Sequence, residues 1–178
     1  MNRFIHICLC LLFGLLLFCP FSGSAAELET RFATITYSDL DDLREFNDEL
    51  YMGRMSSRIR NGTGDSIEDE VISKIDFIVE KVMSVLDMYP SGLKFSIVIR
   101  RDVKAVKLDF KTLYNMDVEY IAFYSPSKNI VFYSADNANI RVVAHEIGHV
   151  VVEHYFKISP PQRIHEVLAQ FAEQHVTD

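Results

Sequence analysis

The sequence predicts a small α+β domain that follows a removable export segment. Two observations predict this fold class: apolar residues recur at helical spacing in several long stretches, and short runs rich in β-branched and aromatic residues separate those stretches. The length of 178 residues fits one domain with a segment to spare. We therefore expect residues 1–26 to form a signal peptide and residues 27–178 to form a single domain.

The N-terminus has the three parts of a secretory signal. Arg3 makes the start positive, residues 4–19 form an almost uninterrupted apolar run, and the small residues Ser24 and Ala26 precede the expected cut after Ala26. This pattern predicts export to the periplasm or the extracellular space, with only transient membrane contact through the signal. Three alternatives stay open: an uncleaved anchor, although this run is short for a spanning helix, a lipoprotein cut before Cys19, and a buried core helix.

Cysteine content and charge exclude several classes of function. All three cysteines lie in the export segment, so the remaining chain has no disulfide and no thiolate for catalysis or for a Cys-rich zinc site. The whole chain carries 18 Lys and Arg against 25 Asp and Glu, a formal net charge of −7, and it loses Arg3 with the signal. Phosphate contacts need clustered Lys and Arg. We therefore expect no nucleic-acid partner.

The first half of the domain is predicted to contain two strands and two helices. Loose alternation predicts the strands, and polar capping residues, Ser38-Asp39 and Ser66, mark the helix starts. In chain order we expect a strand over 28–37, a helix over about 40–50, a loop over 61–65, a helix from 67 until 90–92 ends it, and a strand over 93–100.

The second half is predicted to contain a hairpin and the helices that carry the chemistry. Two aromatic and β-branched runs are separated by a turn-forming segment, as in a hairpin. In chain order we expect a short helix over 103–114, strands over 120–124 and 130–133, a helix over about 137–156, a break at 157–161 with two prolines, and a last helix over about 162–176.

Residues 145–149, His-Glu-Ile-Gly-His, match the H-E-x-x-H pattern. Residues four apart on a helix differ by about 40° of rotation, so both imidazoles leave one face and can bind the same zinc ion. Glu146 lies about 100° round from His145, where its carboxylate can act as general base toward a metal-bound water. The opposite face can pack on a core because it is apolar: Val143, Ile147, Val150 and Val151.

Catalytic zinc needs a third protein ligand, and Glu166 is the strongest candidate. It lies 17 residues after His149, beyond the proline-containing break, on a helix that can fold back as an antiparallel neighbour. Two alternatives remain: Glu173, one to two turns further along the same face, and His165, about 100° off that face. The sequence therefore predicts one Zn²⁺ per chain, held by His145, His149 and one residue of the last helix.

The last helix has two distinguishable faces. Gln170 and Glu173 share the face of Glu166. Ile164, Leu168 and Phe171 lie on the other side, and we expect that side to face the core.

Residues 161–171, Pro-Gln-Arg-Ile-His-Glu-Val-Leu-Ala-Gln-Phe, resemble the P-x-x-x-x-E-G-x-A-x-Y segment of the gluzincin peptidases. Those enzymes bind zinc through H-E-x-x-H and a downstream glutamate. The similarity runs from Val142 to His175, and the small size suggests a minimal gluzincin, or MA-like, type. By position, the resemblance implies that the ligands are His145, His149 and Glu166 and that the base is Glu146.

The resemblance also implies a zincin-like fold. Its short mixed sheet would have an antiparallel edge strand that lies above the metal and pairs with an extended peptide or protein substrate. The candidate strands are 120–124, with Ala122 and Phe123 at its centre, and 130–133. The alternative is a plain hairpin that only packs the core.

The sequence departs from the family pattern at several positions. Val167 replaces the usual glycine and Phe171 the usual tyrosine, both apolar packing changes. Gln170 stands where thermolysin-type enzymes often carry an aspartate that hydrogen-bonds a ligand histidine. We expect Gln170, or Glu173 on the same face, to support a ligand histidine in this way.

The group that would stabilise the oxyanion is not assigned by the sequence. Relatives often place a His or Tyr beyond the ligand glutamate for this purpose. Only His175 follows here, and its helical position points it away from the site. Tyr155 or a tyrosine of the hairpin is the remaining candidate.

Three functions are compatible with these features. The first is zinc-dependent hydrolysis of peptide bonds with Glu146 as general base. The second is a gluzincin-like binding or regulatory protein that keeps zinc but hydrolyses little, motivated by the unassigned oxyanion group. The third is a helical interaction domain without metal, in which the motif is accidental.

Overall fold

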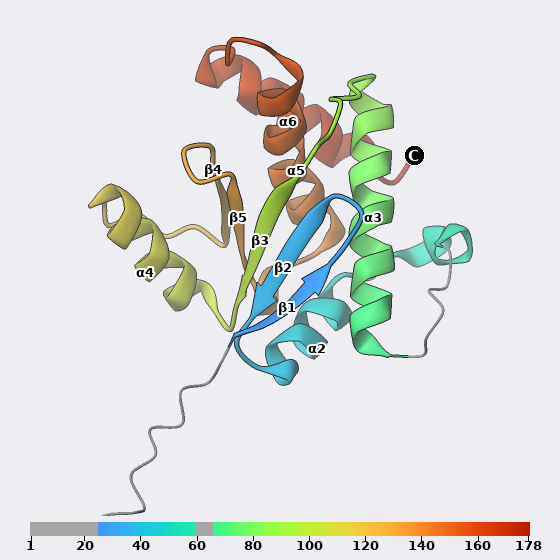
Figure 1. Cartoon of the computed structure of the whole chain (residues 1–178), viewed down its shortest axis with the longest axis vertical. Helices are drawn as coiled ribbons and strands as arrows, with labels where there is room; N and C mark the ends of the chain where they lie inside the picture. The colour runs from blue at the N-terminus through green and yellow to red at the C-terminus, as the bar shows by residue number, and fades with distance from the viewer. Residues whose placement is uncertain (1–24, 60–65) are drawn as a thin grey trace, which may run out of the picture.

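The computed structural model describes residues 25–59 and 66–178. Within these residues, five strands form one mixed sheet with helices on both faces (Figure 1). The expected signal peptide lies almost wholly outside the described residues, and its cut after Ala26 falls at the first residue of strand β1. No helix of the described part is both long and apolar enough to cross a membrane.

The expected single strand over residues 28–37 is wrong: this stretch is part of a hairpin. Strands β1 (Ala26–Glu29) and β2 (Ala33–Tyr37) pair antiparallel. Between them, the hydroxyl oxygen of Thr30 accepts hydrogen bonds from the backbone N–H groups of Phe32 (3.1 Å) and Ala33 (2.8 Å). A hydroxyl can close a tight turn in this way. Threonine is also common in strands, so this turn has no distinct sequence signal.

Helices α2 (Leu40–Glu49) and α3 (Ile67–Leu86) begin at the predicted capping residues. The Asp39 carboxylate accepts a hydrogen bond from the N–H of Asp41, and the Ser66 hydroxyl accepts one from the N–H of Asp69. Helix α3 ends before the expected Pro90 because Asp87 adopts the left-handed conformation, with φ 51°. A short 3₁₀ segment, Gly53–Arg58, follows α2.

The second half of the domain follows the predicted order. Asn139 begins helix α5, because its side-chain oxygen accepts hydrogen bonds from the N–H groups of Arg141 and Val142. The elements are strand β3 (Phe95–Arg100), helix α4 (Val103–Tyr114), strands β4 (Ala122–Ser125) and β5 (Ile130–Ser134), a 3₁₀ turn (Ala135–Asn137), and helices α5 (Ile140–Tyr155) and α6 (Gln162–His175).

The sheet has the order β1-β2-β3-β5-β4. Strands β2, β3 and β5 are parallel, whereas β1 and β4 are antiparallel edges. The predicted α+β class is therefore confirmed, with a mixed sheet and an antiparallel edge strand. Of the two edge strands, β4 is the one that contacts helix α5, and its outer side pairs with no further strand among the described residues.

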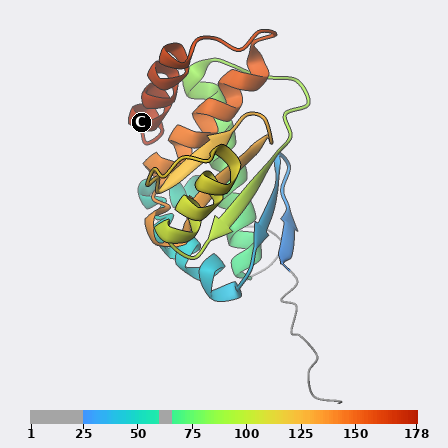
Figure 2. The same cartoon turned by 90° about the vertical axis from the view of Figure 1, so that its left-hand side faces the viewer.

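Helices cover the two sheet faces unequally. The larger core lies between the sheet and helices α2, α3 and α5, and it includes Ala122 of β4. Helix α4 covers the other face, where Val106 packs with Phe123 and Phe132. Figure 2 shows α4 in front of the sheet, with α3 and α5 behind it. Successive residues of β4 therefore face different layers: Ala122 faces α5 and Phe123 faces α4.

Candidate metal centre

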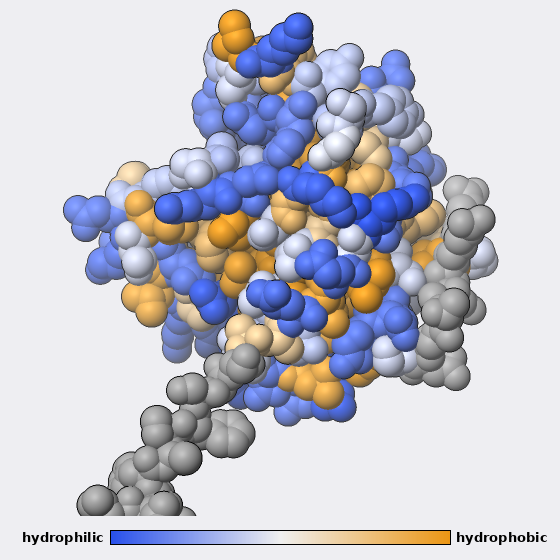
Figure 3. Space-filling view, in the orientation of Figure 1, coloured by the Kyte–Doolittle hydropathy of each residue, from blue (hydrophilic) through white to orange (hydrophobic). Residues whose placement is uncertain are grey.

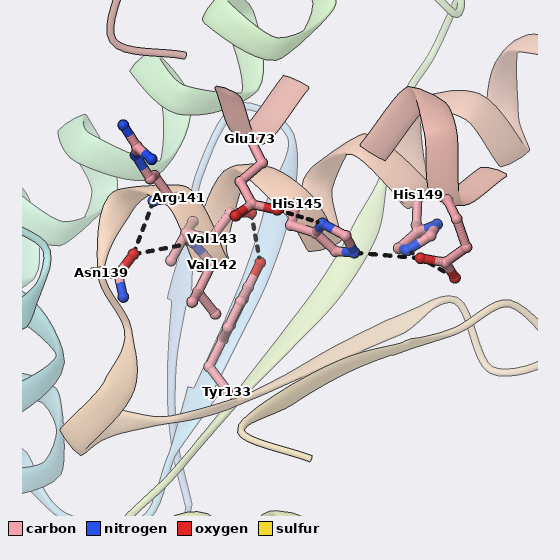
Figure 4. Close-up of polar contacts among 9 residues, drawn as sticks. Tyr133, Asn139, Arg141, Val142, Val143, His145, His149 and Glu173 are labelled. Atoms are coloured by element: carbon pink, nitrogen blue, oxygen red, sulfur yellow. Dashed lines mark hydrogen bonds and ion pairs between the residues drawn. The ribbon is translucent and has the colours of Figure 1, made fainter. Parts of the chain in front are cut away.

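Helix α5 is held so that its histidine face is turned away from the core. The buried Tyr133 hydroxyl donates a hydrogen bond to the carbonyl of Val143 at 3.0 Å, which fixes the first turn of α5 to strand β5 (Figure 4). The predicted core-facing residues are all fully buried: Val143, Ile147, Val150 and Val151. The imidazoles of His145 and His149 consequently leave the opposite side of the helix.

Helix α6 approaches α5 very closely at Gly148. A Cβ atom placed on Gly148 would lie 3.0 Å from the Cα of Ala169 and 3.4 Å from the Cβ of Ala172. Large side chains do not fit such a narrow gap, so the small-residue face of α6 packs inward. The expected core-facing side of α6 is therefore wrong: Ile164 and Phe171 are each 45% exposed.

The Gly148→Ala variant is expected to lower the free energy of unfolding by about 1 kcal/mol. Overpacking a tight contact costs about 1–3 kcal/mol, and the added methyl group meets the Ala169 backbone rather than a flexible side chain. The gain in helix propensity returns up to about 1 kcal/mol. Urea unfolding of the zinc-free protein measures the difference.

The matched control for this packing test is Ser84→Ala, at an exposed position of α3. There an alanine changes helix propensity without entering a close contact, so stability should be unchanged or slightly higher. A Gly148→Ala variant at least as stable as the wild type would contradict the tight α5–α6 contact.

The close approach of α6 brings Glu166 to both histidines. One carboxylate oxygen of Glu166, Oε2, lies 3.7 Å from Nε2 of His145. The other, Oε1, lies 3.7 Å from Nε2 of His149. One donor atom from each of the three residues lies within 4.8 Å of the others. A tetrahedral zinc ion with bonds of 2.0–2.2 Å separates its donors by roughly 3.3–3.6 Å. These residues therefore fit zinc after a small contraction, and they leave a fourth position open.

Glu173 contacts His145 at Nδ1, the ring nitrogen that does not face Glu166. Its Oε2 lies 2.9 Å from Nδ1 of His145, and Figure 4 shows the carboxylate directed at that ring. A carboxylate that accepts the Nδ1–H of a histidine leaves Nε2 free for the metal and raises its basicity. This geometry makes Glu173 a hydrogen-bond partner of His145 rather than a metal ligand. The sequence had left both roles open. Gln170, the other candidate, is exposed, and Nδ1 of His145 is bonded to Glu173 instead.

The Glu173→Ala variant is expected to bind zinc about 10–100-fold more weakly, the usual loss when a partner of a ligand histidine is removed. Glu173→Gln should lose less, because the amide oxygen still accepts the Nδ1–H of His145. Competition with a chromophoric chelator measures both affinities.

The exposed Gln170, one turn before Glu173 on the same helix, supplies the matched control. Gln170→Ala is expected to keep the wild-type affinity for zinc. If Glu173→Ala also kept that affinity, Glu173 would have no part in orienting His145.

His165, the other alternative ligand, contacts side chains outside the donor set. It is 5% exposed, and its Nε2 lies 3.2 Å from Oε2 of Glu153 and 3.1 Å from Oγ of Ser159. Ser159 in turn donates a hydrogen bond to Glu153 at 2.7 Å. This cluster ties the connection between α5 and α6 to both helices, and so it helps to set the position of Glu166. Sequence reasoning missed Ser159 and Glu153, because their partners meet only in the folded chain.

Glu146 is buried beside the three donors and is 9% exposed. Burial raises the pKa of the Glu146 carboxyl to about 8, against the effect of a hydrogen bond from the backbone N–H of Tyr124, and the negative charges of Glu166 and Glu173 add to the rise. Burial and the nearby His145 lower the pKa of His149 to about 4. A neutral imidazole is the form that binds a metal.

A cleft of about 340 Å³ joins these groups to the edge strand. His145, Glu146, His149 and Glu166 line it, together with residues 122–124 of β4. The candidate strand residues Ala122 and Phe123 thus lie at the same cleft as the donor set. Their expected pairing with a substrate remains a prediction.

Comparisons of the chain with protein-family models, with curated proteins and with solved structures find no match.

Proposed function

We propose that this protein is an exported zinc-dependent peptidase of the gluzincin type. One observation carries the proposal: two imidazole nitrogens and a carboxylate converge on one point beside a buried glutamate, in a cleft bounded by an unpaired strand edge. Two histidines and one carboxylate with an open fourth position are a donor set typical of catalytic zinc. The inference of export rests on the N-terminal sequence alone.

The bound metal, Glu146 and the outer edge of β4 each have a distinct role in peptide hydrolysis. When bound, zinc supplies a Lewis acid that polarises the scissile carbonyl and lowers the pKa of a water molecule. Glu146 takes the proton of the attacking water and passes it to the leaving amine, a role open to a carboxylate that lies beside the donor set rather than within it. The outer edge of β4 binds the main chain of an extended peptide by adding it as a further strand.

A second function is favoured because the candidate residues for oxyanion stabilisation lie outside the cleft or contact other residues. Tyr155 is 47% exposed, packs on Phe156 and is not a cleft residue. Tyr124 lines the cleft, but its hydroxyl donates to Asn129 at 3.2 Å. Tyr120 also lines the cleft, but its ring packs on Phe110, and His175 pairs with Asp178. The alternative is therefore a zinc-binding protein with little hydrolytic activity.

Zinc content and peptide hydrolysis by the purified protein test both functions. A peptidase is expected to contain about one zinc per chain, to cleave members of a mixed peptide library, to lose this activity to a chelator and to regain it with added zinc. Zinc-replete protein that cleaves no peptide would support the binding function instead. Protein that holds no zinc tightly would contradict both.

A further inference from the structure

We propose that the α4 side of the cleft is a subsite for an aromatic or large aliphatic side chain of the peptide substrate. This inference rests on the proposed function and adds a substrate class to it. The subsite is formed by Phe110 of α4, Tyr120 before β4, and Phe123 of β4, which we call the aromatic wall.

The aromatic wall is a connected group of rings on the cleft surface. The ring centroid of Phe110 lies 4.8 Å from that of Tyr120 and 5.1 Å from that of Phe123, with interplanar angles of 60° and 87°. All three residues line the cleft, and Tyr120 is 42% exposed. Figure 3 shows hydrophobic residues at the surface over α4, on the left of the molecule. Aromatic surface of this kind at a cleft marks a place where a ligand binds.

The register of β4 explains why a substrate reaches this wall. Side chains alternate between the two faces along a strand, and β4 already shows this, with Ala122 toward α5 and Phe123 toward α4. A peptide that pairs with the outer edge of β4 follows the same alternation. Of the two residues that flank the scissile bond, one therefore points toward α5 and the other toward the aromatic wall.

The charges around the cleft disfavour an acidic side chain or a terminal carboxylate of the substrate. Among the described residues that line the cleft none is Lys or Arg, whereas Glu146, Glu153 and Glu166 are acidic. An acidic side chain or a terminal carboxylate thus finds no cationic partner. An aromatic ring, by contrast, can pack edge-to-face or offset on the rings of Phe110 and Tyr120.

The test compares peptides that carry Phe or Ala at each of the two positions flanking the scissile bond. The zinc-loaded wild type is expected to prefer Phe at one position by about 10–100-fold in kcat/KM, as hydrophobic pockets commonly discriminate. Tyr120→Ser should reduce that Phe-to-Ala ratio by about tenfold, and Tyr120→Phe should keep it. Tyr155→Ser, at a similarly exposed tyrosine outside the cleft, should also keep it.

Binding of the same peptides to the Glu146→Gln variant, measured by fluorescence anisotropy, separates the subsite from the peptidase activity. Tighter binding of the Phe peptides without hydrolysis by the wild type would support the subsite and contradict the peptidase proposal. Hydrolysis without a Phe preference, or a preference that Tyr120→Ser leaves unchanged, would overturn the subsite. Protein that neither binds nor cleaves these peptides would overturn both.

Discussion

Replacing Glu146 with glutamine is expected to reduce kcat by about 10²–10⁴-fold, the usual contribution of a positioned general base, while the protein keeps its zinc. Glutamine preserves the shape of the side chain, but its amide cannot accept the proton of the attacking water. The side chain is 9% exposed and lies beside the donor set rather than within it. Peptide hydrolysis under saturating conditions measures kcat, and elemental analysis measures the zinc content.

Glu153 offers a matched control for this experiment, because it is a second carboxylate of helix α5 at the same cleft. Its contacts are to Ser159 and His165 rather than to the donor set. Glu153→Gln is therefore expected to cost far less activity than Glu146→Gln. A Glu146→Gln variant that retained wild-type turnover would refute the proposed role of the carboxylate.

Replacing Glu166 with alanine is expected to weaken zinc binding by more than about 100-fold, beyond the loss typical of a residue that only supports a ligand. Its carboxylate supplies the only donor of α6 in the group with His145 and His149 within the described residues. The side chain is 42% exposed, so its removal should leave the zinc-free fold intact. Chelator competition gives the affinity.

Thermal unfolding provides an independent reading of the same variant. A ligand that binds only the folded state raises its stability in proportion to ln(1 + [L]/Kd). At the same zinc concentration, the Tm of the wild type and of the exposed control Gln170→Ala should therefore rise clearly more than the Tm of Glu166→Ala. Unchanged zinc affinity in Glu166→Ala would show that this residue is not a ligand.

The parts of the fold that were predictable from the sequence depend on local chemistry. Asp39 and Ser66 begin their helices because short polar side chains satisfy free N–H groups. Helix α4 has the predicted bounds, Val103–Tyr114. The apolar side of α5 is buried as the helical period requires, because that period is fixed by backbone geometry.

The parts that were not predictable depend on how separate elements meet. The side of α6 that packs inward follows from the narrow gap at Gly148, a property of two helices together. The most apolar side of α6 therefore did not predict correctly which side of this helix faces the core. The turn at Thr30 was missed for another reason, since one hydroxyl with two backbone bonds decides between a long strand and a hairpin.

The candidate site, too, has one part that was predictable from the sequence and one part that depends on the fold. The i, i+4 spacing alone places His145 and His149 on one face. Glu166 and Glu173 share a face of α6, so sequence reasoning could rank them but could not separate their roles. Only the fold does so, because Glu166 lies near both Nε2 atoms whereas Glu173 contacts Nδ1 of His145.

The most direct test of the zinc centre is anomalous diffraction at the zinc absorption edge from crystals of the zinc-loaded protein. The proposal requires one strong peak at about 2.0–2.2 Å from Nε2 of His145, Nε2 of His149 and a carboxylate oxygen of Glu166. A peak at other side chains, or no peak from protein with zinc in excess, would contradict it.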